Sequence, residues 1–136
     1  GNYPNTNTID KITVATTGNA IDWADQLTTG HAMGGVGNET RGIWFGGYSV
    51  TAQNTWQNII QYVTIATQAD TVDFGDLLNS PSHIHGVTDA TKGVIAGGAL
   101  SSTTNVIQYV TIASTGNATD FGDLTVARYS YGNASG

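Results

Sequence analysis

The sequence has no cysteine and few charged residues. Without cysteine, the 136-residue chain can form neither disulfides nor thiolate metal sites. Four Lys and Arg residues stand against ten Asp and Glu residues, which gives a net charge of −6. A protein that binds nucleic acid needs a basic surface to displace counterions, and an anionic membrane attracts the same charge. Since the chain also lacks a long apolar run, we expect neither nucleic acid nor a membrane as a partner.

The shortage of charge also limits what can cover the surface. Charged residues make up only 10% of the chain, so Thr, Asn, Ser, Gly and Gln must form most of the surface. Neutral polar surfaces of this kind are frequent on secreted and virion proteins. The composition therefore favours an extracellular or virion-surface location.

The chain is built from repeats. Segments that begin at Ile9, Ile60 and Ile107 align without gaps, with spacings of 51 and 47 residues. Each segment ends in an Asp-aromatic-small-Asp motif: DWAD at 22–25, DFGD at 73–76 and DFGD at 120–123. A Gly-Gly pair recurs at 46–47 and 97–98. Regular self-similarity of this length is typical of solenoids and propellers.

Each repeat has the composition of β-strands. The stretch 60–67 is rich in β-branched and aromatic residues, and 119–124 follows a turn and can return as its antiparallel partner. Weaker strands are predicted at 31–36, 82–87 and 128–133. No segment keeps a 3.6-residue period, so we predict an all-β fold with almost no helix. Apolar residues occupy both faces of 60–67, which indicates small sheets stacked face to face.

These features resemble the repeats of kelch-type β-propellers. The features that carry the resemblance are the two Gly-Gly pairs, Tyr62, Tyr109, the motif aromatics Trp23, Phe74 and Phe121, and Arg128. The near-identical copies also resemble, more loosely, repetitive structural proteins of marine phages and environmental bacteria. The kelch resemblance implies one domain over residues 1–136, a propeller segment of about three four-stranded blades. The blades would span about 2–47, 48–98 and 99–136, the last of them incomplete.

Three blades are too few to close a ring, because closed propellers use about four to eight. The Gly-Gly strand expected after Arg128 is also missing from the sequence. Either the chain is an excerpt of a longer array, or copies associate to complete the ring. We expect a homo-oligomer, with a dimer favoured.

The repeated aspartates, Asp22/Asp25, Asp73/Asp76 and Asp120/Asp123, allow two interpretations. Asp-Phe-Gly binds magnesium in protein kinases, but the other kinase motifs are absent. Paired carboxylates suit Ca²⁺ if a bulge at Gly75 and Gly122 brings them together. The favoured alternative is that the carboxylates accept backbone N–H bonds at strand ends.

Two histidines form a second candidate site. His83 and His85 are two residues apart, so on a strand they would share a face and could ligate a transition metal with a third ligand. The pair is not repeated, and a polar strand edge is the favoured interpretation.

Aromatic residues follow the Gly-Gly pairs and form the third candidate. Tyr48 and Trp56 lie in one such loop, and Tyr3 lies in the equivalent N-terminal segment. Aromatics beside Asn, Gln and Thr suit stacking against a sugar, and they equally suit packing against a neighbouring blade or chain.

The sequence offers little support for catalysis. It has no Gly-x-Ser-x-Gly motif and no cysteine nucleophile, and the paired carboxylates recur, whereas an active site is a unique constellation. We therefore predict a non-enzymatic structural or adhesive module on a virion or cell surface. The first alternative is a carbohydrate-binding propeller, and the second is a glycan-processing enzyme completed by missing blades.

Overall fold

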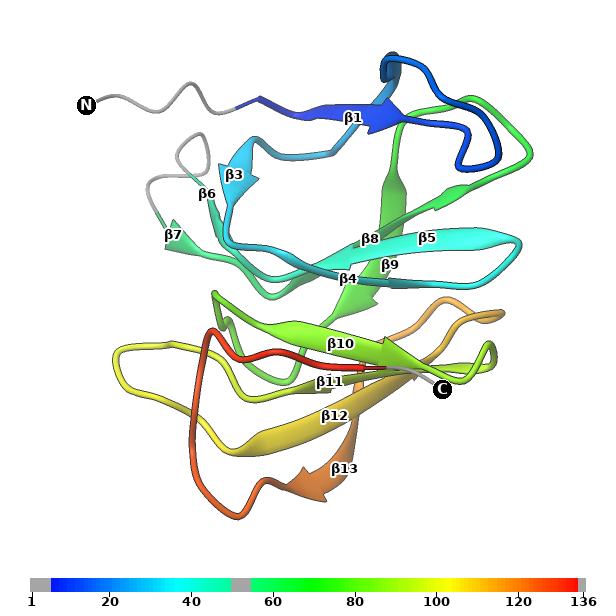
Figure 1. Cartoon of the computed structure of the whole chain (residues 1–136). Coiled ribbons are helices and arrows are strands. Elements are labelled where there is room, and N and C mark those ends of the chain that lie inside the picture. The colour runs from blue at the N-terminus through cyan, green and yellow to red at the C-terminus, as the bar shows by residue number, and fades with distance from the viewer. Residues whose placement is uncertain (1–5, 50–54, 135–136) are drawn as a thin grey trace.

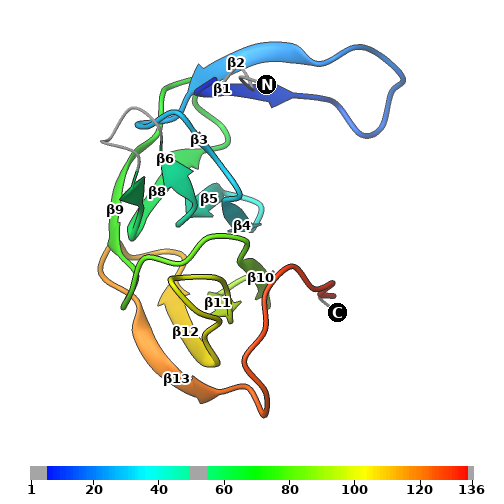
Figure 2. The same ribbon diagram turned by 90° about the vertical axis from the view of Figure 1, so that its left-hand side faces the viewer.

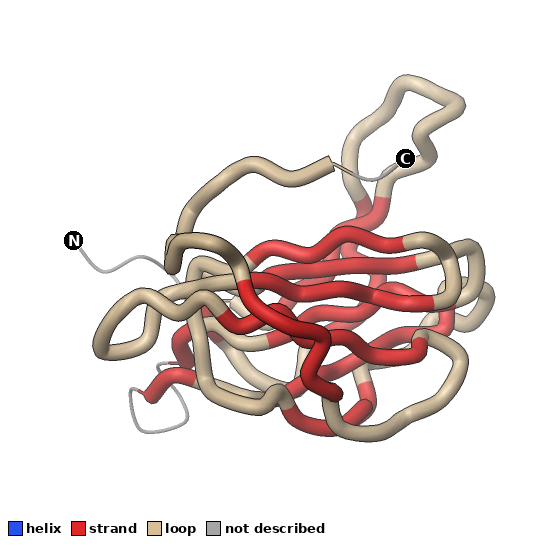
Figure 3. The backbone as a smooth tube through the Cα atoms, turned by 90° about the horizontal axis from the view of Figure 1, so that it is seen from below, coloured by secondary structure: helices blue, strands red, loops and turns tan. Residues whose placement is uncertain are grey.

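The protein is built from β-strands and loops. The computed structural model describes residues 6–49 and 55–134, and within these ranges it has thirteen strands and no helix (Figures 1 and 3). The prediction of an all-β fold is confirmed. In the described part of the chain, no helix is long and apolar enough to cross a membrane.

The strands form four antiparallel sheets, none of which closes on itself. The first sheet pairs β1 (Thr8–Lys11) with β2 (Ile21–Asp25). The second sheet has the order β4 (Gly34–Gly37), β5 (Arg41–Phe45), β8 (Ile59–Thr64), β9 (Val72–Asp76). The third sheet has the order β10 (His85–Thr88), β11 (Lys92–Ala96), β12 (Val106–Thr111), β13 (Thr119–Asp123). A small side sheet has the order β3 (Gly30–His31), β6 (Tyr48–Ser49), β7 (Thr55–Trp56).

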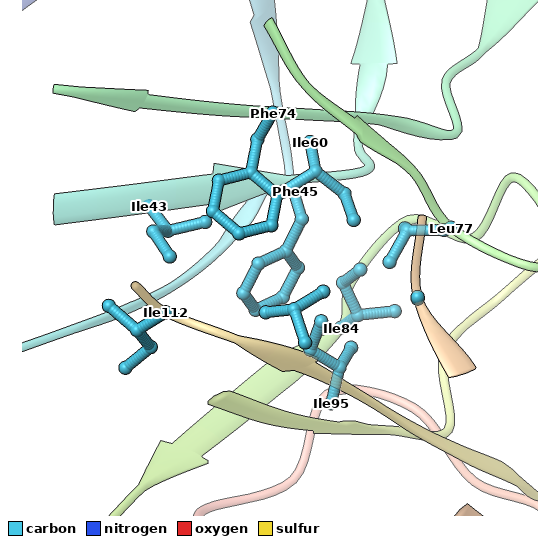
Figure 4. Close-up of a cluster of buried hydrophobic side chains, with 10 residues drawn as sticks. Ile43, Phe45, Ile60, Phe74, Leu77, Ile84, Ile95 and Ile112 are labelled. Atoms are coloured by element: carbon cyan, nitrogen blue, oxygen red, sulfur yellow. The ribbon is translucent and has the colours of Figure 1, made fainter. Parts of the chain in front are cut away.

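The second and third sheets are stacked face to face. In Figure 2 each runs from β4 or β10 on one side to β9 or β13 on the other, and β4 contacts β10. Figure 4 shows their apolar side chains pointing into one shared core, with Phe45 facing Ile84. The buried members are Ile43, Phe45, Ile60, Phe74, Leu77, Ile84, Ile95, Val110, Ile112 and Ala118.

The second sheet is covered on both faces. Ile60 belongs to the core shared with the third sheet, whereas Val63 packs with Ile9 and Trp23 of the first sheet. Both Ile60 and Val63 are buried. The stacking predicted from the apolar residues of 60–67 is therefore confirmed. The strand itself ends at Thr64, because residues 64–67 form a turn.

The Asp-aromatic-small-Asp motif is a β-bulge in each sheet. In the second sheet, Ile60 pairs with Gly75 and Gln61 pairs with Asp73, so Phe74 is the extra residue. Trp23 and Phe121 are skipped in the same way. The bulge that was suggested by Gly75 and Gly122 is therefore present. It turns the aromatic toward the next sheet: Phe74 is 2% exposed and Trp23 is 9% exposed.

The contact between neighbouring sheets recurs with equivalent residues, which lie 51 or 47 positions apart. Between the first and second sheets, the Thr71 N–H donates to the Asp25 carbonyl at 2.9 Å. Between the second and third sheets, the Ala118 N–H donates to the Asp76 carbonyl at 2.8 Å. Asp70 and Asn117 accept equivalent bonds from the N–H groups of the same two aspartates, each at 3.0 Å.

The strand predicted at 128–133 is not formed. Ser130 has a left-handed backbone with φ of 50°, which interrupts an extended strand. The segment nevertheless lies along the third sheet. The Tyr131 hydroxyl donates to the Ala96 carbonyl at 2.5 Å, and the Asn133 amide donates to the Gly86 carbonyl.

Candidate functional site

Three side chains form a row across the side sheet. His31 pairs with Tyr48, and Tyr48 pairs with Trp56, in direct antiparallel register. Residues directly opposite each other in a sheet point to the same face. The rings of His31 and Tyr48 are 5.5 Å apart and tilted by 43°. We call His31, Tyr48 and Trp56 the aromatic row; Figure 1 places its strands at one edge of the molecule.

The aromatic row is accessible from solvent. Trp56 is 41% exposed, His31 is exposed and Tyr48 is half-buried. Ser49 and Thr55 pair one position along from Tyr48 and Trp56, so their side chains point to the other face of the side sheet. Ser49 is buried there, and its hydroxyl donates to the Thr29 carbonyl at 3.0 Å. The exposed ring faces of the row offer apolar surface for stacking.

Among residues 6–49 and 55–134, the complete row occurs in one repeat. In the next repeat the equivalent pairs are the isolated bridges Ser82–Ala99 and Ala99–Thr103. Ser82 therefore replaces His31, Ala99 replaces Tyr48 and Thr103 replaces Trp56. The loop after Gly47 is four residues longer than the loop after Gly98, and this insertion accompanies the side sheet. A row confined to one repeat is the kind of feature that a specific binding role requires.

The structure brings together two of the three residues predicted for ligand binding. Tyr48 and Trp56 are cross-strand partners. Tyr3 lies outside the described residues. Sequence reasoning missed His31. The repeat alignment does contain a signal for it, since His31 carries a ring where the following repeat has Ser82.

His83 and His85 do not share one strand face. His83 precedes β10 and has a φ of 52°, so the alternation of an extended strand does not apply to it. Its Nδ1 lies 3.0 Å from the Ser82 hydroxyl, and its ring packs edge-on against Tyr129. His85 instead packs against Tyr131 with centroids 5.4 Å apart. The shared-face geometry expected for a metal site was therefore wrong.

The described residues contain no group of three or more His, Cys, Asp or Glu residues that could hold a metal ion. The bulge places Asp73 and Asp76 opposite Gln61 and Ile59, which are two residues apart on β8, so both carboxylates lie on one face. Two carboxylates fall short of the six to eight oxygens that Ca²⁺ requires. The structure therefore gives calcium binding no geometric support.

The expected capping role of the repeated aspartates was also wrong. Within residues 6–49 and 55–134, no hydrogen bond is made by the carboxylates of Asp22, Asp25, Asp73, Asp76, Asp120 or Asp123. Two of them, Asp25 and Asp76, bond to the next sheet through their backbones instead: the N–H of each donates to that sheet and the C=O accepts from it.

Two larger hollows lie elsewhere on the surface. One, of about 330 Å³, lies between the first and second sheets and is lined by apolar side chains that include Trp23, Trp44 and Ile65. Lys11 closes one side, with its ammonium 5.7 Å from the Trp23 ring. The second hollow, of about 400 Å³, lies on the third sheet beside Phe121.

Two smaller hollows, of about 210 and 170 Å³, are lined by equivalent residues of the β12–β13 and β8–β9 hairpins. Because they recur with the repeat, they reflect the architecture and not a unique site.

Comparison with known proteins gives no family assignment. No protein-family model matches the sequence, and a search of curated proteins finds no significant match. The function must therefore be inferred from the arrangement of this chain's own residues.

Proposed function

We propose that the chain is a kelch-like β-propeller module with a non-enzymatic structural or adhesive role on a virion or cell surface. The observation that carries the proposal is the recurrence of one sheet-to-sheet contact with equivalent hydrogen bonds. A contact that is repeated in the same way turns each sheet by a similar step relative to the last. Radial repetition of four-stranded sheets is the construction principle of propellers.

The packing of the strands supports the same proposal. β4 contacts β10, so the first strands of the second and third sheets are close. In Figure 2 the strands of each sheet follow one another outward from this contact, as the strands of a blade do. The exposed carboxylates of the repeated motif also favour a structural role, since every repeat carries them.

A crystal structure of the purified chain in its assembled state tests the propeller. Sheets arranged about one common axis, with β4 and β10 nearest to it, support the proposal. Sheets stacked in a straight line contradict it. A screen with glycoside, ester and phosphoester substrates tests the non-enzymatic role, and turnover that co-purifies with the protein contradicts it.

A second candidate function is carbohydrate binding through the aromatic row. The observation that favours it is the restriction of His31, Tyr48 and Trp56 to one repeat, whereas the other features of the sheets recur. Exposed rings suit stacking against the apolar face of a sugar. The next repeat, with Ser82, Ala99 and Thr103 at these positions, shows that the fold tolerates small side chains there.

Glycan-array binding tests this candidate. Trp56→Thr and Tyr48→Ala each install the residue that the next repeat carries, so the fold should be retained. Tyr129→Ala is the control, because Tyr129 is an exposed ring outside the row. Glycan binding lost in the first two variants and kept in the third supports a lectin function. No binding by the unaltered protein, or equal loss in the control, contradicts it.

A further inference from the structure

The third sheet exposes a surface whose equivalent on the second sheet is buried. Phe121 is 57% exposed, whereas Phe74, at the same place in the second sheet, is 2% exposed. Gly122 has open space around it, whereas the backbone of Gly116 lies against Gly75. We call residues 120–123 the open motif.

The buried contact shows what fits such a surface. Three residues of the β12–β13 loop, Gly116, Asn117 and Ala118, cover the motif of the second sheet. The Gly116 N–H donates to the Phe74 carbonyl at 2.7 Å, and the Ala118 N–H donates to the Asp76 carbonyl at 2.8 Å. Ile112 of the same loop is fully buried in the shared core.

The same loop occurs once more, in the hairpin between β1 and β2. Gly18, Asn19 and Ala20 occupy the positions of Gly116, Asn117 and Ala118 and are identical to them. Val14 stands at the position of Ile112 and is 92% exposed. A Cβ added at Gly18 would meet no atom of the rest of the chain within 4 Å, so the space beside it is open. We call residues 12–20 the free loop.

The chain therefore exposes both halves of a contact that it makes internally. The open motif has the sequence DFGD, identical to the motif that is buried in the second sheet. The middle repeat differs, since it has Ala69-Asp70-Thr71 in the loop position and meets DWAD of the first sheet. The pairing of a Gly-Asn-Ala loop with a DFGD motif is thus found in the buried contact between the second and third sheets. The same two sequences are the ones exposed in the free loop and the open motif.

From this match we propose that the free loop of a second copy of this chain docks on the open motif of the first. The contact is head-to-tail, with Gly18 and Ala20 donating to the carbonyls of Phe121 and Asp123. Val14 enters the hollow of about 400 Å³ beside Phe121. This inference rests on one part of the proposed function, namely that neighbouring sheets stack through the same repeated contact.

A basic side chain is also in the right place. The Arg41 guanidinium donates to the Ile112 carbonyl across the buried contact at 2.7 Å. Lys92 is the equivalent of Arg41 and lines the hollow beside Phe121. In the docked arrangement its ammonium faces the carbonyl of Val14.

The segment 128–134 leaves room for the docked loop. It lies beside the inner strand β10, where Ser130 donates to the His83 carbonyl and Arg128 accepts from the Gly98 N–H. Of this segment, Ala134 lines the hollow. Phe121 on the outer strand stays exposed in its presence.

Sedimentation equilibrium of the full chain tests the docking. Phe121→Asp disables the open motif, and Val14→Asp disables the free loop. Leu78→Asp is the matched control, since Leu78 is 52% exposed and belongs to neither surface. We expect the unaltered chain and the control to associate. Each of the other two variants should raise the dissociation constant about tenfold or more, as expected for a central interface residue.

Mixing decides whether the contact is head-to-tail. A mixture of Phe121→Asp and Val14→Asp retains one intact open motif and one intact free loop, so it should form a one-to-one complex with the affinity of the unaltered contact, at concentrations where each variant alone is largely monomeric. A symmetric contact would not be rescued in this way. Circular dichroism checks that both variants are folded. We expect their spectra to match that of the unaltered chain, because the Phe121 and Val14 side chains are exposed.

Three results would overturn the inference: an unaltered chain that stays monomeric, a mixture that stays monomeric, or a control that weakens association equally. A monomeric chain whose Gly116 and Ala118 amides still exchange slowly would overturn the docking alone. It would leave the repeated stacking intact, because those two bonds lie within one chain.

Discussion

The backbone N–H of His83 donates a hydrogen bond of 2.9 Å to the carbonyl oxygen of Ala32. Both residues are left-handed, with φ of 52° and 58°. Ser130, at the third equivalent position, has φ of 50° and donates to the His83 carbonyl at 3.3 Å. One backbone conformation is thus linked through three repeats while the side chain changes from Ala to His to Ser. The backbone, and not the side chain, sets this part of the contact between repeats.

Ala32 should therefore tolerate glycine but not a β-branched residue. A β-branched side chain is strongly disfavoured at a φ of 58°. We expect Ala32→Val to lower the free energy of unfolding by about 1–3 kcal/mol, the usual cost of such strain. Ala32→Gly should change it by less than about 1 kcal/mol, because relief of strain offsets the entropy of glycine. Urea unfolding measures both, and equal stability of the two variants would contradict the backbone account.

Gly75 and Gly122 form a matched pair. Both have positive φ, of 147° and 142°, but a Cβ at Gly75 would lie 2.4 Å from the Gly116 carbonyl oxygen, whereas Gly122 has open space. In dilute solution we expect Gly75→Ala to cost about 1–3 kcal/mol more than Gly122→Ala, as overpacking does. Thermal unfolding of the two variants gives the difference. Equal losses would mean that the close approach of Gly75 to Gly116 has no energetic weight.

Phe74 and Phe121 provide the corresponding test for side chains. Phe74→Ala empties a buried site and should cost about 3–5 kcal/mol. Phe121→Ala should cost much less in dilute solution, because that ring is already 57% exposed. Chemical denaturation of both variants checks this, and similar losses would show that the third sheet is covered within the single chain.

Asp89 should make the β10–β11 turn sensitive to acid. Hydrogen bonds from the Lys92 N–H, and then from the hydroxyl and N–H of Thr91, lower the pKa of Asp89 from 3.8 to about 2. A carboxyl with a lowered folded-state pKa stabilises the fold fully above its unfolded pKa, and this contribution is lost as the pH falls through the folded value. The turn should therefore lose stability between about pH 4 and pH 2.

Asp89→Asn separates charge from geometry in this turn. Asn38, the equivalent residue of the preceding repeat, already accepts the same three bonds from Thr40 and Arg41 without a charge. The variant should keep the turn and show a smaller change in unfolding free energy between pH 4 and pH 2. An unchanged pH dependence, measured by urea unfolding across this range, would show that Asp89 does not cause it.

The strands and their stacking could be predicted from the sequence because their signals are local. Residues 60–67 carry apolar side chains on both faces of the predicted strand. Ile60 on one face and Val63 on the other are both buried. Glycine after the motif aromatic indicated a bulge, and the register confirms one at Phe74. The side sheet gave no such signal, because two-residue strands have no periodicity and their pairing depends on the inserted loop.

The errors concern positions where tertiary contacts override local rules. The sequence predicts an extended strand at His83, but its backbone is left-handed and bonds to Ala32 and Ser130. The motif carboxylates were expected to cap strand ends, whereas the oxygens that bond the Asp25 and Asp76 N–H groups come from Asp70 and Asn117, more than 40 residues away in the sequence. Contacts between repeats of this kind cannot be read from one repeat alone.

Amide hydrogen exchange as a function of protein concentration tests the central claim most directly. The amides of Gly116 and Ala118 should exchange slowly at every concentration, because they are bonded within the chain. Those of Gly18 and Ala20 should exchange fast in dilute solution and slow down as the chains associate. Amides of Gly18 and Ala20 that stay fast while the protein sediments as an oligomer would contradict the docking of the free loop on the open motif.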